Sequence, residues 1–188
     1  ELFCGDVFAS LSADAVLARI LAVTGPAGSL LMVKIYTGDR LNFGLAAERA
    51  RAFGLKFNIV IVYDDIALPN FPQARGLAGT LFVHKIAGAM VENGANLEEC
   101  VVTANRVIKV IRSIGMSLDT CTVSGSLKEE RILKGKVELG LGIHGEAAFE
   151  QVDFKGARNA ITQVVDRLSN LRPKTPHVAL LNNLGSSS

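Results

Sequence analysis

Residues 29–63 read SLLMVKIYTGDRLNFGLAAERARAFGLKFNIVIVY. Two short apolar runs, residues 29–35 and 57–63, enclose a segment with the apolar spacing of a helix. Continuous apolar runs of this length are typical of strands that are buried on both faces of a parallel sheet. The stretch therefore predicts two parallel strands joined by a turn at residues 37–39 and a helix over residues 40–53.

The segments on either side continue this alternation. Ser12 is expected to cap a helix that runs through Val23 and ends at Gly25-Pro26. Further along, apolar periodicity predicts helices over residues 79–92 and 97–114. Alternating strands and helices predict an α/β domain with a mostly parallel or mixed sheet and flanking helices.

The pattern changes after Gly115, which places a domain boundary there. We expect a first α/β domain at residues 1–116, incomplete at its N-terminus, and a second, smaller α/β domain at residues 117–188, incomplete at its C-terminus. The elements predicted for the second domain are strands over residues 118–123, 137–143 and 177–181 and a helix over residues 157–171.

Composition narrows the class of protein. Lys and Arg number 20 and Asp and Glu 18, and they are scattered, which is unlike the concentrated basic face of a nucleic-acid binder. Mean hydropathy is +0.32, yet no apolar run approaches the ~18 residues that span a bilayer. The three cysteines, Cys4, Cys100 and Cys121, are unpatterned, which favours buried thiols in a reducing compartment. We therefore expect a cytoplasmic protein without membrane or nucleic-acid partners.

The exit of the first predicted strand is one candidate site. Lys34 and Asp39 flank the Tyr-Thr-Gly turn there, and ligands of open α/β sheets bind outside the carboxyl ends of strands. Both side chains can therefore point toward a ligand. In the alternative interpretation, Asp39 caps the following helix and Lys34 is a solvated strand end.

A second candidate is the sequence Gly140-Leu141-Gly142-Ile143-His144-Gly145-Glu146. Glycines let a ligand approach the backbone closely. A neutral imidazole, whose unperturbed pKa is about 6.5, is a competent nucleophile near neutral pH. His144 is therefore a candidate nucleophile that Glu146 helps to orient, the alternative being a turn histidine without a role.

Other polar residues favour structural roles. Asp64 and Asp65 follow the second strand and are more consistent with capping of the next turn than with an acid/base or metal site. His84 is predicted to be a core or packing histidine, and His177 is predicted to open a strand in a structural role. Ligand spacing for zinc, a Walker A motif and a dinucleotide fingerprint are all missing, so no metal site or nucleotide site is expected.

Taken together, these segments resemble the substrate-binding unit of dihydroxyacetone (glycerone) kinases. The resemblance spans the chain in order, and the stretches that carry it are residues 4–10 (CGDVFAS), 23–28 (VTGPAG), 36–44 (YTGDRLNFG), 75–80 (RGLAGT), 84–89 (HKIAGA), 138–146 (ELGLGIHGE) and 180–185 (LLNNLG).

The resemblance implies a kinase that phosphorylates an alcohol group of dihydroxyacetone. In such a unit His144 adds to the ketone carbon as a hemiaminal, while Lys34 and Asp39 contact the substrate and Asp39 assists deprotonation of a hydroxyl. The phosphoryl donor is Mg-ATP, or ADP re-phosphorylated by a phosphotransferase relay, on a separate helical domain or subunit. The unit is also expected to form a homodimer in the cytoplasm.

The sequence departs from the family pattern in several places. The N-terminal Gly-Ser-Gly-His segment, which supplies a further histidine, is missing from residues 1–188. The usual Lys-Asn-Tyr is Lys34-Ile35-Tyr36, and the usual Gly-Glu-Pro-Gly after the histidine is Gly145-Glu146-Ala147-Ala148. The chain alone is therefore expected to phosphorylate nothing.

Two other functions remain open. A regulatory paralogue that binds the ketose and signals to a partner without catalysis would keep the same residues. A flavodoxin-like nucleotide-binding domain is suggested by fold analogy alone.

Overall fold

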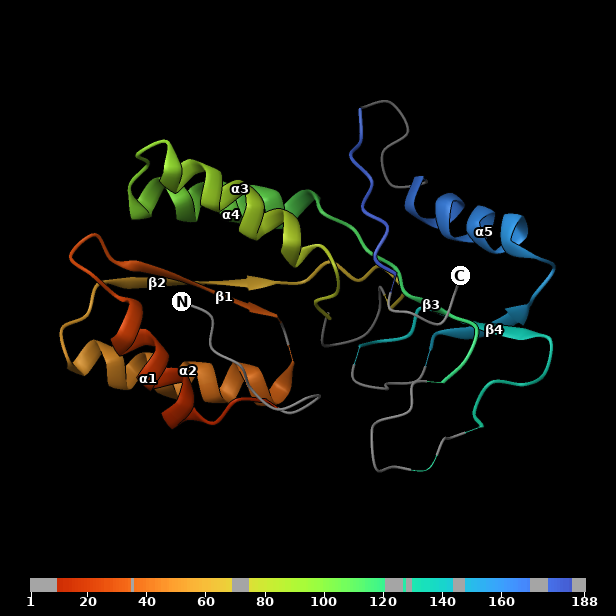
Figure 1. The fold of residues 1–188 in the computed structure, drawn as a ribbon, viewed down its shortest axis with the longest axis horizontal. Helices are drawn as coiled ribbons and strands as arrows, with labels where there is room; N and C mark the ends of the chain where they lie inside the picture. The colour runs from red at the N-terminus through yellow and green to blue at the C-terminus, as the bar shows by residue number, and fades with distance from the viewer. Residues whose placement is uncertain are drawn as a thin grey trace. The chain divides into compact units, whose positions relative to one another are not determined.

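The computed structural model describes residues 10–34, 36–68, 75–120, 127, 130–143, 148–169 and 176–183 (Figure 1). The chain forms two compact units. Unit 1 comprises Glu1–Asp64 and Gly79–Ile111, and unit 2 comprises Asp65–Ala78 and Arg112–Ser188. The assignment of separate folding domains to residues 1–116 and 117–188 stays a prediction.

Unit 1 is a three-layer arrangement around a parallel strand pair. Its elements are α1 (Ala13–Val23), β1 (Ser29–Lys34), α2 (Thr37–Ala52), β2 (Phe57–Val62), α3 (Thr80–Glu92) and α4 (Leu97–Val110). The two strands pair in parallel from Ser29↔Phe57 to Lys34↔Val62. Helices α1 and α2 lie on one face of the pair, and α3 and α4 lie on the other (Figure 1). The predicted strand–helix–strand unit is therefore confirmed.

The side-chain alternation of β2 explains why both faces are covered. Successive residues of a strand point to opposite faces. Phe57 packs in the cluster formed with α1 and α2, whereas Val60 and Val62 pack in the cluster formed with α3 and α4. Because β2 is apolar on both faces, it is stable only when helices cover each of them.

Several helix ends follow the sequence signals. The Ser12 hydroxyl accepts a hydrogen bond of 3.2 Å from the amide of Ala15, which confirms the predicted cap of α1. At the start of α4, Asn96 and Glu99 form a capping box, with hydrogen bonds of 2.9 and 3.0 Å. Gly54 follows α2 with a φ of 73°, a left-handed conformation that glycine adopts without steric cost.

Two helix ends differ from the prediction. Helix α2 begins at Thr37, three residues before the expected start, because extended Tyr36 is its N-cap. Residues 37–39, which were expected to form a separate turn, are thus the first turn of the helix. The backbone amides of a first helical turn have no acceptor within the helix. Helix α4 ends at Val110 rather than near residue 114. The chain leaves the helix there because Ser113 pairs with Asp65 in a parallel bridge.

The described residues of unit 2 form an antiparallel sheet and one helix. Its elements are β3 (Met116–Ser117), β4 (Lys136–Leu139), β5 (Glu150–Asp153) and α5 (Ala157–Ser169), and the sheet order is β3-β4-β5. Strand β4 pairs with β5 from Lys136↔Asp153 to Leu139↔Glu150. The chain therefore combines a parallel and an antiparallel sheet with flanking helices, as expected for a mixed α/β chain.

The predicted strands of unit 2 were only partly correct. Strand β3 lies at Met116–Ser117, whereas residues 118–120 form no strand, and Cys121–Val123 lie outside the described residues. The strand expected over residues 137–143 ends at Leu139, and β5 was not predicted. Residues 177–181 are not a strand either: they are exposed, and no described segment pairs with them.

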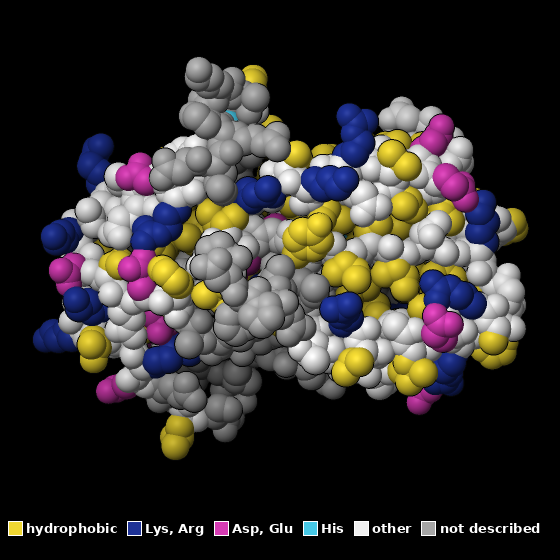
Figure 2. Space-filling view, turned by 180° about the vertical axis from the view of Figure 1, so that it is seen from behind, with side chains coloured by type: hydrophobic (Ala, Val, Ile, Leu, Met, Phe, Trp, Pro, Cys, Tyr) yellow, Lys and Arg dark blue, Asp and Glu magenta, His cyan; other side chains and the backbone are white. Residues whose placement is uncertain are grey.

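The surface carries mixed charge. On the face shown in Figure 2, Lys and Arg side chains of the described residues are scattered among acidic and hydrophobic ones, without a region of one sign. None of the helices described is long and apolar enough to cross a membrane. Cys100 is buried with a free thiol, while Cys4 and Cys121 lie outside the described residues.

Candidate functional site

Lys34 and Asp39 both lie where β1 ends. Lys34 is the last residue of β1 and Asp39 is the third residue of α2, and both are partly exposed. Within the described part of the chain, neither side chain forms a hydrogen bond or an ion pair. Asp39 is not the N-cap, which is Tyr36, although a carboxylate in the first turn interacts favourably with the helix dipole. No hydrogen bond or ion pair among the described residues therefore gives either side chain a structural role.

The first turn of α2 is held in place by the segment that precedes α1. The Asn42 side chain donates a hydrogen bond of 2.7 Å to the carbonyl oxygen of Leu11. A Cβ atom at Gly38 would lie 2.7 Å from the Ser10 hydroxyl, so a larger residue at position 38 would require the Ser10 side chain to move. Gly38 and Asn42 thus fix the backbone next to Asp39.

His84 lies on α3 and interacts electrostatically with Lys34. The side chain is exposed, so the prediction of a core histidine was wrong; Val83 and Ala87 are the buried residues of this turn. Partial loss of hydration lowers the pKa of His84, and the positive charge of Lys34 lowers it further. Because Lys34 follows Leu30 and Met32 at the strand period of two, its side chain lies on the α3 side of the sheet.

Asp64 and Asp65, by contrast, are committed to structural contacts. Asp64 is 3% exposed and accepts a hydrogen bond of 2.7 Å from the amide of Gly79, immediately before α3. Asp65 accepts one of 2.9 Å from the amide of Ala67 and pairs with Arg75. The structural interpretation is therefore favoured for both. Among the residues described, no group of three or more His, Cys, Asp or Glu side chains forms a metal site.

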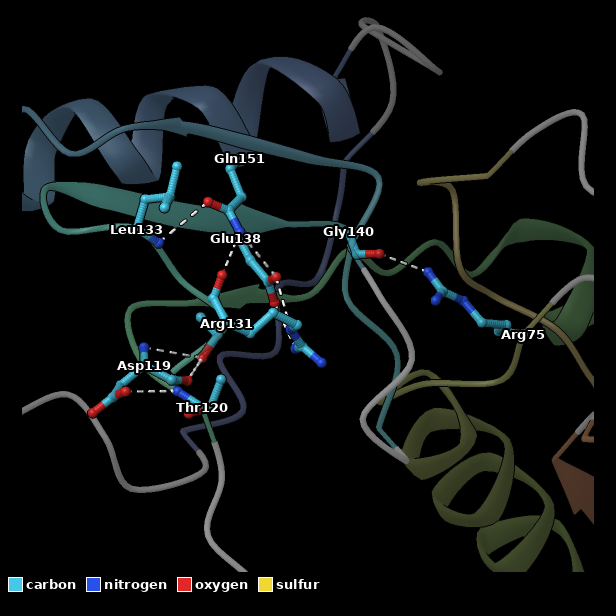
Figure 3. Close-up of polar contacts among 9 residues, drawn as sticks. Arg75, Asp119, Thr120, Arg131, Leu133, Glu138, Gly140 and Gln151 are labelled. Carbon is cyan, nitrogen blue, oxygen red and sulfur yellow. Dashed lines mark hydrogen bonds and ion pairs between the residues drawn. The ribbon is translucent and has the colours of Figure 1, made fainter. Parts of the chain in front are cut away.

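The strand exit that precedes His144 is fixed at Gly140. The Gly140 amide donates a hydrogen bond of 2.7 Å to the carbonyl oxygen of Gly115. The Gly140 carbonyl oxygen accepts one of 2.7 Å from Arg75 (Figure 3). Its φ is 80°, and a Cβ atom there would lie 2.5 Å from that of Ala67. His144 and Glu146 lie outside the described residues, so their proposed roles stay predictions.

A second polar network lies on β4. Glu138 is 3% exposed and accepts hydrogen bonds of 2.9 and 2.6 Å from the Arg131 guanidinium. Gln151 of β5 donates a hydrogen bond of 3.0 Å to the carbonyl oxygen of Arg131 (Figure 3). This network holds residues 130–133 against the sheet.

Sequence reasoning missed the Asp65–Arg75 pair. A lone arginine beside Gly76-Leu77-Ala78-Gly79 signals burial among small residues, and a buried arginine needs a carboxylate. That signal points to Asp64 or Asp65 without deciding between them. Elsewhere, an open hollow of about 920 Å³ between α3 and α4 is lined by none of the predicted site residues.

Comparison with known proteins identifies the class. Residues 2–188 match the profile of the Dak1 domain. The dihydroxyacetone kinase of Citrobacter freundii is 47% identical over 187 residues, which cover 98% of this chain and 34% of that protein. Its crystal structure with AMP-PNP and Mg²⁺ gives a TM-score of 0.87 over 92% of this chain and 32% of that one.

Two further relatives bear on function. The dihydroxyacetone-binding subunit of a PTS-dependent dihydroxyacetone kinase of Listeria innocua is 38% identical, and the match covers 98% of this chain and 58% of the subunit. A co-activator of a dihydroxyacetone kinase operon, Dha-DhaQ, is 26% identical with a TM-score of 0.80, covering 85% of this chain and 50% of that one.

This chain belongs to the Dak1 domain family. It spans about a third of the length of curated relatives that include a putative 3,4-dihydroxy-2-butanone kinase of Solanum lycopersicum, the C. freundii dihydroxyacetone kinase and a human triokinase/FMN cyclase.

Proposed function

We propose that the chain is the substrate-binding part of a dihydroxyacetone kinase. Family membership and the names of the C. freundii and L. innocua relatives support this substrate. The geometric observation that carries the proposal is the strand exit at Lys34 and Asp39. An ammonium and a carboxylate remain partly exposed there, whereas both carboxylates at the exit of β2 are committed to the fold.

The proposed substrate bond is a reversible hemiaminal at His144. The unprotonated ring nitrogen attacks the ketone carbon, a C–N bond forms, and the carbonyl π electrons move to oxygen. That oxygen gains a proton while the other ring nitrogen loses one, so the whole ketone is added and nothing leaves. Such a bond supplies affinity that a three-carbon ligand with few atoms otherwise lacks. It also orients the hydroxyl that reacts.

Lys34 and Asp39 have different roles in this proposal. The Asp39 carboxylate accepts a hydrogen bond from the substrate hydroxyl and takes its proton as the oxygen attacks phosphorus. The Lys34 ammonium donates a hydrogen bond to a substrate oxygen and stabilises negative charge that develops there.

The phosphoryl donor is proposed to lie outside this chain, on a helical domain or subunit. It is Mg-ATP, or ADP re-phosphorylated by a phosphotransferase relay. We also propose a homodimer, as the resemblance implies. The isolated chain is not expected to catalyse transfer.

A regulatory function is the second candidate. The likeness to the operon co-activator Dha-DhaQ supports a regulator. In this candidate the protein binds dihydroxyacetone and signals to a partner. Both candidates predict substrate binding, and they differ in whether phosphate is transferred.

A pair of histidine variants tests the proposal in the full-length protein. Native mass spectrometry with dihydroxyacetone is expected to show an adduct that gains the complete ketone mass. His144→Ala should remove both this adduct and formation of dihydroxyacetone phosphate. His177→Ala changes an exposed histidine and should remove neither. An adduct that persists in His144→Ala would refute the covalent role, and an adduct without phosphorylation by either donor would favour the regulator.

A further inference from the structure

The Asp65–Arg75 ion pair contacts Gly140, which precedes His144 by four residues in the sequence. The side chains of Arg75 and Asp65 are 8% and 1% exposed, and the Arg75 Nε–H donates a hydrogen bond of 2.6 Å to Asp65. Burying such a pair contributes little net stability compared with apolar residues of the same volume. Stability alone is therefore a weak reason for placing these two charges there.

Asp65 is itself anchored by the backbone around it. The amide of Asp65 donates a hydrogen bond of 3.1 Å to the carbonyl oxygen of Arg75, and the amide of Ile66 donates one of 2.9 Å to that of Ser113. The Asp65 carboxylate also accepts a bond of 2.9 Å from the amide of Ala67. The carboxylate thus gives the guanidinium a fixed orientation.

A second edge of the guanidinium reaches the β4–β5 connection. The Arg75 Nη2–H donates a hydrogen bond of 2.7 Å to the carbonyl oxygen of Gly140, the residue after β4 (Figure 3). The first and last residues of this connection, Gly140 and Phe149, also lie close together. A Cβ atom on Gly140 would lie 3.0 Å from the Cβ atom of Phe149. In the sequence, His144 lies near the middle of the segment between these two residues.

We propose that the Asp65–Arg75 pair is a positioning device for His144, an inference that rests on the proposed function. Arg75 joins Asp65 to the base of the β4–β5 connection, and the planar guanidinium can hold a carboxylate and a carbonyl oxygen at once. Arg75 does not touch substrate in this account. It fixes the point from which the connection leaves the sheet, and so limits the orientations that the imidazole can take.

The test compares Arg75→Lys with Arg131→Lys in the full-length protein. Lysine at position 75 keeps a positive charge beside Asp65 but lacks the planar fork that also reaches Gly140. Arg131 is the matched control, since it too pairs with a buried carboxylate of unit 2, Glu138, but holds residues 130–133. The readouts are the dissociation constant of the dihydroxyacetone adduct, kcat and KM for phosphorylation, and the unfolding midpoint.

Arg75→Lys is expected to weaken the adduct about 10-fold to 100-fold, as a misplaced reacting group does. Arg131→Lys should lower the unfolding midpoint by a similar amount and leave the adduct within about twofold, because it does not contact the connection at Gly140. Equal adduct affinity in Arg75→Lys and the unsubstituted protein, or an equal loss in both variants, would overturn the inference and leave the proposed function intact.

Two further outcomes are also decisive. If the unsubstituted protein forms no adduct, the proposed function and this inference both fail. If Arg75→Lys does not fold, Asp65→Asn takes its place, since it keeps an oxygen for Ala67 and weakens the charge-assisted bond to Arg75. Its adduct should then weaken by about 10-fold, and an unchanged adduct would refute the positioning role.

Discussion

Asp39 and Asp64 each follow a strand of unit 1, and replacing each with alanine is expected to change a different property. Asp64 is buried and accepts a hydrogen bond from the amide of Gly79, whereas Asp39 is partly exposed. Asp64→Ala leaves a buried amide without this charged acceptor, which costs about 2 kcal/mol. Asp39→Ala removes only a favourable charge from the first turn of α2, which costs about 0.5 kcal/mol.

Amide hydrogen exchange measures this difference locally, without assuming that the protein unfolds in a two-state transition. In Asp64→Ala, the amides at the start of α3 should exchange about 30-fold faster, since about 1.4 kcal/mol corresponds to a factor of ten. In Asp39→Ala, the amides at the start of α2 should exchange about twofold faster.

Catalysis should show the opposite pattern. Phosphorylation of dihydroxyacetone by the full-length protein should fall by about 10² to 10⁴ in Asp39→Ala, as expected for loss of a general base. Asp64→Asn, which keeps an oxygen for Gly79, should retain most of the activity. If Asp64→Asn abolished turnover with normal exchange of α3, Asp64 would be a catalytic group and the assignment of the site would be wrong.

The remaining predictions concern His84 and Gly28. Lys34→Met should raise the pKa of His84 in an NMR titration but leave it below 6.5, because partial loss of hydration is the larger cause of the shift; Lys85→Met is the control and should not change it. Because the pKa of His84 is lower in the folded protein than in the unfolded protein, the unfolded protein binds more protons as the pH drops below 6.5. The free energy of unfolding therefore falls in that pH range, and Lys34→Met should make this fall smaller. Gly28→Ala should destabilise unit 1 by about 1 kcal/mol more than Gly94→Ala. Both glycines have positive φ, but only at Gly28 would a Cβ atom meet Leu97 and the Lys56 carbonyl oxygen, each at 2.9 Å. Equal losses measured by denaturant unfolding would show that the steric argument fails.

Local signals predicted the parts of the fold that depend on local physics. Ser12 caps α1, Gly54 follows α2, and the apolar runs around Val33 and Val60 form the parallel pair. Each feature depends on side-chain chemistry or periodicity within a few residues, so the sequence alone suffices to find it.

Features that depend on distant partners were not predicted. Helix α4 ends early because Ser113 pairs with Asp65, and residues 177–181 form no strand although their apolar run favours one. His84 was assigned to the core because its neighbours are apolar, yet the helix turns its side chain outward. At the site, Lys34 and Asp39 were singled out by position, but only the three-dimensional structure shows that neither side chain forms a hydrogen bond or ion pair with another described residue. The Asp65–Arg75 pair joins residues ten apart, beyond the range of periodicity arguments.

A ¹³C NMR spectrum of the full-length protein with dihydroxyacetone labelled at the ketone carbon tests the central claim most directly. If the substrate is held as a hemiaminal, the bound label should give the resonance of a carbon with four single bonds, coupled to a ¹⁵N-labelled imidazole, and His144→Ala should abolish it. A bound label that keeps its ketone resonance, or an unchanged adduct signal in His144→Ala, would contradict the account.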